Sequence, residues 1–104
     1  MRKILVSPDF GAGWSTWMHD GNGSSLFALT YQPIIDALDR GEKLDYNSPS
    51  VVQFVKDYKE KFGTEPYTGG LGDLEVREVS GRVHIREYDG SESVIEESTP
   101  GYYI

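Results

Sequence analysis

The stretch SPSVVQFVKDYKEKFG (residues 48–63) constrains the fold more tightly than any other part of this 104-residue chain. Ser48 is a favoured N-cap residue, Pro49 suits the first helical position, and Gly63 is a favoured residue at a helix end. Between these ends, apolar residues recur at helical spacing: Val51, Val52, Phe54, Val55, Tyr58 and Phe62. The pattern predicts an amphipathic helix with a charged, solvated side, and we interpret it as a packing helix.

After this helix, the apolar period changes from that of a helix to that of a strand. The segments 74–79, 82–88 and 91–97 alternate and predict three antiparallel strands. The Ser80-Gly81 and Asp89-Gly90 pairs between them are typical of short hairpin turns. Upstream, residues 3–7 (KILVS) predict a first strand, and residues 31–40 predict a first helix that ends at Gly41.

These elements predict a single α+β domain over residues 1–104, with the order β-α-α-β-β-β. Two helices are expected to pack on one face of a small antiparallel sheet. No apolar run approaches the ~18 residues of a membrane span, and the first residues do not resemble a signal peptide. We therefore expect a cytoplasmic protein that has no membrane partner.

The composition excludes several classes of function. There is no cysteine, which excludes disulfides, thiolate nucleophiles and zinc–thiolate sites. Ten Lys and Arg residues against 17 Asp and Glu residues give a formal net charge of -7. This charge disfavours nucleic acid as a partner, because contact with phosphates needs concentrated positive charge. An acidic surface that binds a basic protein stays open.

The loop after the first strand contains FGAGWSTWMHDGNG (residues 10–23) and is the first candidate site. The amides of Gly11 and Gly13 can approach an anion closely, since glycine has no side chain. Trp14 and Trp17 offer flat faces on which a base can stack. Further hydrogen-bonding groups come from Ser15, Thr16 and His19. The alternative is that both tryptophans fill the core and the glycines only turn the chain.

A basic stripe is the second candidate. Alternation along residues 82–88 places Arg82, His84 and Arg86 on one side of a strand. Guanidinium groups bind phosphate or carboxylate through two parallel hydrogen bonds. The alternative is cross-strand pairing with the acidic residues at 75, 78 and 87. If the stripe and the loop converge, they form a site with aromatic and cationic parts that suits a nucleotide-like ligand.

Catalysis has little support in the sequence. Ser15, His19 and Asp20 are the residue types of a nucleophilic triad, but a glycine-rich loop gives them no rigid orientation. His19 and His84, with an aspartate from position 9 or 20, lack the spacing of a metal site. We therefore predict no enzyme activity, no cofactor and no metal.

Two segments, KILVSPDFGAGWSTW and GGLGDLEVREVSGRVHIREYDGSESVIEE, resemble small tailed-phage proteins of unassigned function. They cover nearly half of the chain, with a GAGWSTW-type loop and an EYDGxE hairpin as the shared features. The resemblance implies phage origin, an infected bacterial host and an α+β fold, and it supplies no catalytic residue. Arg86 stands where many such proteins have an acidic residue, so the resemblance assigns it no role.

Together these observations favour a phage-encoded small-molecule binding protein. It would act in counter-defence and sequester a nucleotide-derived signal without catalysis. The alternative is an acidic protein–protein inhibitor of a host defence enzyme or of a nucleic-acid-binding enzyme. The loop favours the first hypothesis, because an acidic mimic has no need of it. A homo-oligomer with its pocket between chains stays open.

Overall fold

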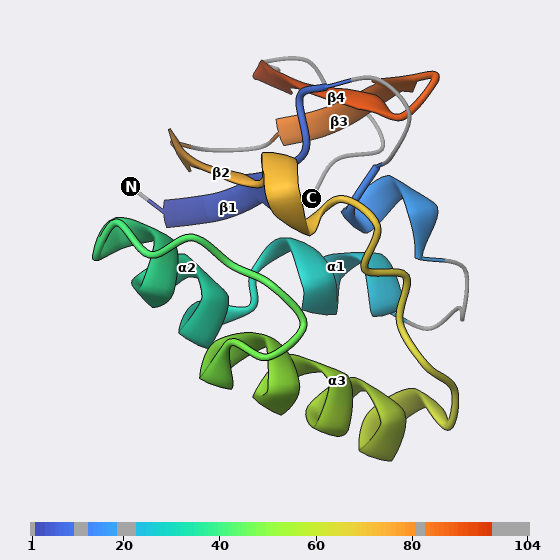
Figure 1. The fold of residues 1–104 in the computed structure, drawn as a ribbon. Coiled ribbons are helices and arrows are strands. Elements are labelled where there is room, and N and C mark those ends of the chain that lie inside the picture. Colours follow the sequence, from blue (N-terminus) through green and yellow to red (C-terminus); the bar gives the residue numbers. More distant parts are fainter. Residues whose placement is uncertain (1, 10–12, 19–22, 81–82, 97–104) are drawn as a thin grey trace.

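The computed structural model describes residues 2–9, 13–18, 23–80 and 83–96, and its fold is drawn in Figure 1. The elements follow in the order β1 (Arg2–Val6), η1 (Ser15–Trp17), α1 (Ser24–Leu29), α2 (Gln32–Asp39), α3 (Pro49–Phe62), η2 (Leu71–Asp73), β2 (Glu75–Val79), β3 (Val83–Tyr88) and β4 (Ser91–Glu96). The α+β class and the order of the predicted elements are confirmed. The six-residue helix α1 is an addition that the sequence does not signal, because no capping side chain marks its start.

The strands form two antiparallel two-stranded sheets, β1–β2 and β3–β4, where the sequence predicts one sheet. The Asp89-Gly90 hairpin is confirmed: Tyr88 pairs with Ser91, and both turn residues have positive φ. The Ser80-Gly81 hairpin is wrong, because β2 pairs with β1 and not with β3. Val79 and Val83 both lie in the core between the two sheets, so the chain crosses there from one sheet to the other.

The layers are stacked, with β3–β4 on one side of β1–β2 and the helices on the other (Figure 1). Alternation along β1 divides the core accordingly. Leu5 packs into the helical cluster with residues such as Phe54, whereas Ile4 and Val6 pack between the sheets. The helices therefore cover one face of the β1–β2 sheet, as expected. Among the described residues, no helix is both long enough and apolar enough to cross a bilayer.

Helix α3 is the outermost layer in Figure 1 and positions the candidate site. It begins at Pro49 after the N-cap Ser48 and ends at Gly63, whose φ of 78° is one that glycine adopts readily. The buried side of α3 is formed by Val51, Phe54 and Tyr58. Val52 is 54% exposed, although the sequence pattern groups it with the core residues.

Candidate functional site

Trp14 lies in the core. Its side chain is fully buried, and its ring centroid is 5.1 Å from that of Phe54. Its indole Nε1 donates a hydrogen bond to the carbonyl oxygen of Ala28 at 2.9 Å, so the polar atom of the ring is satisfied. Trp14 therefore offers no ring face to a ligand, which corrects its predicted stacking role: this tryptophan fills the core.

Two loop amides bind an anion, the carboxylate of the protein's own Glu92; they belong to Trp14 and Thr16, whereas the amides predicted to bind an anion are those of Gly11 and Gly13. The buried carboxylate of Glu92 accepts hydrogen bonds from the backbone N–H groups of Ser7 (2.9 Å), Trp14 (2.9 Å) and Thr16 (3.0 Å), and from the Thr16 hydroxyl (2.5 Å). Hydrogen bonds to an ionised acceptor are among the strong ones. These amides are therefore satisfied inside the protein and are not open to a phosphate.

The remaining loop residues have separate surroundings. Gly13 is buried under the ring of Trp17, Ser15 is 1% exposed, and Thr16 is half-buried beside Glu92. Trp17 is half-buried, and its ring centroid is 5.1 Å from that of Tyr67. Gly11 and His19 lie outside the described residues. Of the predicted ligand-binding residues of the loop that the structure describes, Thr16 and Trp17 are accessible in part.

Among the described side chains, the basic stripe is represented by Arg86, which forms no hydrogen bond or ion pair with a described loop residue. Arg86 is exposed on β3 and makes no ion pair with any described residue, so the cross-strand pairing of the alternative interpretation does not occur at this residue. Arg82 lies outside the described residues. His84 is in β3, where its Cα is paired with that of Ile95.

Two carboxyl groups that the sequence does not connect lie together. A side-chain hydrogen bond with Asp9 raises the pKa of Asp73, and burial and the charge of Asp9 add to the rise. Neither residue lines the groove described next. Within the described residues, no cluster of three or more metal-ligating side chains occurs, and His19 and Asp20 of the metal alternative lie outside them.

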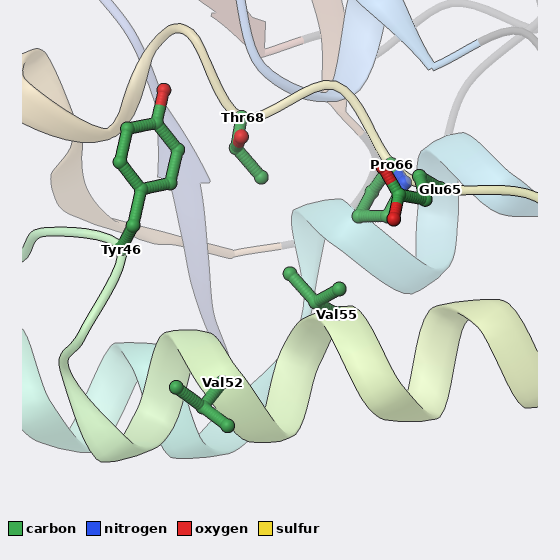
Figure 2. A pocket seen from close by; sticks show the side chains of 6 residues that line it. All are labelled: Tyr46, Val52, Val55, Glu65, Pro66 and Thr68. Carbon is green, nitrogen blue, oxygen red and sulfur yellow. The ribbon is translucent and has the colours of Figure 1, made fainter.

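The structure instead brings exposed apolar side chains together in a groove along α3, which we call the α3 groove (Figure 2). It has a volume of about 370 Å³ and is lined by Tyr46, Val52, Val55, Glu65, Pro66 and Thr68. Tyr46 stands at one end, Glu65 and Pro66 at the other, and Val55 lies between them. Pockets for small molecules are of this size, mostly apolar, with a few polar groups.

A short turn fixes Tyr46 beside the start of α3. The Asp45 carboxylate accepts a hydrogen bond from the Asn47 N–H at 2.8 Å, and the Ser48 hydroxyl accepts one from the Asp45 N–H at 2.9 Å. Asp and Ser side chains stabilise turns in this way. The turn leaves Tyr46 66% exposed, a high value for an aromatic ring that has no partner ring among the described residues.

Charged residues border the groove. Lys56 follows Val52 by one helical turn, and Lys59 follows Val55 by one turn, so both lysines lie on the groove side of α3. Lys59 pairs with Glu65 at 3.4 Å, and both side chains are at least half exposed. Lys56 makes no ion pair with any described residue. The groove side of α3 thus carries two lysines on a protein whose net charge is -7, and the groove's own Glu65 pairs with one of them.

The sequence contains one signal for this groove. The interpretation of residues 48–63 as a packing helix overlooks it. Val52 is in line with Lys56 and Lys59 on the solvated side of the helix. An apolar residue within a charged stripe adds to a binding surface only where other exposed apolar residues lie beside it. No sequence pattern predicts that Tyr46 and the segment 65–68 line the groove, because the position of a loop depends on its tertiary contacts.

The chain matches no protein-family model, and no curated protein and no solved structure is significantly similar to it.

Proposed function

We propose that this protein is a non-catalytic binding protein whose α3 groove holds a nucleotide-like small molecule. One observation carries the proposal. Four large hydrophobic residues are markedly exposed among the described residues, and two of them, Tyr46 and Val52, line this single groove. Exposed apolar side chains that gather in one concave place are typical of a binding surface.

The apolar end of the groove suits a planar ring. Tyr46 supplies an aromatic face on which a base can stack, and Val52 and Val55 supply an aliphatic floor. The Thr68 hydroxyl can donate or accept a hydrogen bond at the ring edge. Such a mixture of stacking and few polar contacts tolerates several bases.

The helix side of the groove suits an anionic group attached to that ring. Lys56 and Lys59 follow Val52 along α3 and would lie near a phosphate whose base contacts Tyr46. Lysine is a common phosphate ligand that acts as a point charge. The proposed ligand class is therefore a planar base joined to a phosphate. It is the class that the sequence suggested, at a different place in the molecule.

The resemblance to tailed-phage proteins adds a biological setting to this proposal. A protein that binds a nucleotide-derived signal without breaking a bond lowers the free concentration of that signal. In an infected bacterium this would be a counter-defence role. The proposal includes a cytoplasmic location, where such signals are made.

A thermal-shift panel tests the proposal. We expect AMP and cyclic nucleotides to raise the melting temperature of the wild-type protein, because a ligand that binds only the folded state stabilises it. Adenosine should raise it less, and inorganic phosphate alone should not raise it. Tyr46→Ala should weaken AMP binding about tenfold, since stacking on an aromatic side chain contributes roughly 1–3 kcal/mol per base.

Tyr88→Ala is the matched control. Tyr88 is 75% exposed and does not line the groove, so its removal should leave the AMP response unchanged. Equal losses of the AMP response in both variants would show that AMP does not bind in the α3 groove. A wild-type protein that responds to no nucleotide, but binds a basic host protein in a salt-sensitive way, would favour the inhibitor alternative.

A further inference from the structure

One wall of the α3 groove is a segment without regular structure, residues 63–70, which we call the strap. It runs from the end of α3 to η2 (Figure 1). Between residues 64 and 67 it makes no backbone–backbone hydrogen bond with any described residue. The Lys59–Glu65 pair is exposed, and such pairs contribute little to stability. The position of the strap must therefore be set by side-chain packing.

The two sides of the strap have different roles. Pro66 and Thr68 line the groove, whereas Tyr67, between them, does not. The Tyr67 ring packs against Trp17, with ring centroids 5.1 Å apart and planes tilted by 44°. Aromatic contacts of this kind stabilise a pair of rings beyond the effect of their buried area. The strap is thus held between the groove and the glycine-tryptophan loop.

The Trp17 ring is held in place by its own contacts with the loop and with β3. Its ring lies on Gly13, where an added Cβ would come within 2.6 Å of a ring carbon. Its Nε1 is 3.3 Å from a carboxylate oxygen of Glu87, which also accepts a hydrogen bond from the Gly90 N–H. Close by, the backbone of Gly70 approaches the Gly13 carbonyl so tightly that no Cβ would fit. The loop and the far end of the strap are therefore packed as one unit.

We propose that Trp17 is a positioning residue for the α3 groove. It does not line the groove; through Tyr67 it holds the strap at the distance from α3 that a bound ligand needs. The inference rests on the proposed function of the groove and assigns a task to the glycine-tryptophan loop. The loop acts on the ligand through the strap and not by direct stacking.

The first test needs no ligand. ¹⁵N relaxation measures backbone motion directly, and the wild-type strap should have order parameters near the rigid value of about 0.85 at residues 65, 67 and 68. In Trp17→Ala these values should fall below about 0.6, while those of α3 stay unchanged. Trp17→Phe keeps a ring against Tyr67 and should keep the strap rigid.

The second test measures AMP affinity by titration calorimetry. If the unanchored strap occupies its binding position about one tenth of the time, the apparent affinity falls about tenfold in Trp17→Ala. Trp17→Phe should bind nearly as tightly as the wild type. Tyr67→Ala removes the same contact from the strap side and should reproduce both effects, which covers the case in which Trp17→Ala does not fold.

The outcomes separate the two proposals. A mobile strap and weakened AMP binding in both alanine variants support the positioning role. A strap that stays rigid in both variants, or AMP binding that stays unchanged in both, overturns it. If the strap becomes mobile but the wild-type protein binds no nucleotide, the structural role of Trp17 is supported and the proposed function of the groove fails.

Discussion

At the scale of single residues, Glu92 has the largest structural consequence. It lies on β4, and its carboxylate accepts hydrogen bonds from residues 76 to 85 positions earlier in the chain. It ties the β3–β4 hairpin to the end of β1 and to η1. A buried carboxylate of this kind stabilises only while its oxygens accept hydrogen bonds, because an uncompensated buried charge is very costly.

Glu92→Gln should destabilise the protein. Oε1 accepts from the Ser7 N–H, and Oε2 accepts from the donors of Trp14 and Thr16. A glutamine amide must turn its NH₂ group toward one of these donors, so we expect a loss of roughly 1–3 kcal/mol in the free energy of unfolding. Urea unfolding measures it.

Glu78→Gln is the control for this prediction, since Glu78 is exposed on β2. Its effect should stay within about 0.5 kcal/mol. Equal unfolding midpoints for the two variants would contradict the assigned role of Glu92. The sequence could not reveal this role, because a glutamate in an alternating strand is typical of a solvated face and its donors are far away along the chain.

At the scale of elements, α3 is joined to the start of α2 by Tyr31. The Tyr31 hydroxyl donates a hydrogen bond to the Asp57 carboxylate at 2.6 Å, and the other Asp57 oxygen accepts one from Gln53 at 2.7 Å. The Tyr31 ring also packs against Phe54, with ring centroids 5.0 Å apart. This contact holds the helix that carries the groove against the rest of the helical layer.

The contact predicts a dependence of stability on alkaline pH. Burial, together with the hydrogen bond to Asp57 and its charge, raises the pKa of Tyr31 well above its ordinary value. The folded protein therefore keeps this proton after the unfolded chain has lost it. Its contribution to stability is complete below about pH 10 and is lost as the pH rises further.

Tyr31→Phe should remove this dependence. Between about pH 9 and pH 11, the unfolding free energy of the wild type should fall more steeply than that of the variant. The contact of Lys3 with Asp39 raises the pKa of Lys3 and acts in the same direction, but it is present in both proteins and cancels in the difference. Parallel pH profiles would contradict the assignment.

Some elements of the fold can be predicted from the local sequence, and others cannot. The bounds of α3 and the Asp89-Gly90 hairpin follow from neighbouring residues, and both are confirmed. The strand that pairs with β2 does not follow from neighbouring residues. Ser80-Gly81 is locally a good hairpin turn, whereas the pairing with β1 depends on residues far away along the chain, as in the pair of Arg2 with Val79. The prediction that Val52 belongs to the core is wrong for a similar reason. Helical spacing shows which residues share a face of the helix, but not which part of the protein covers that face.

At the scale of the whole molecule, the core and the groove lie in different layers. The sheets and the inner faces of the helices enclose the buried residues, while the α3 groove lies between α3 and the segment 65–68 (Figure 2). The sequence predicts a binding protein and a special role for the glycine-tryptophan loop. It could not predict that this loop packs against the back of the strap, since the approach of Tyr67 to Trp17 exists only in the folded chain.

Methyl NMR during an AMP titration shows whether the α3 groove binds a nucleotide-like ligand. The methyl groups of Val52, Val55 and Thr68 line the groove, whereas Val79 and Val83 are buried between the sheets and serve as internal references. We predict saturable shifts of the three groove residues and none of the references. Shifts confined to other parts of the protein, or no shift at all, would contradict the account.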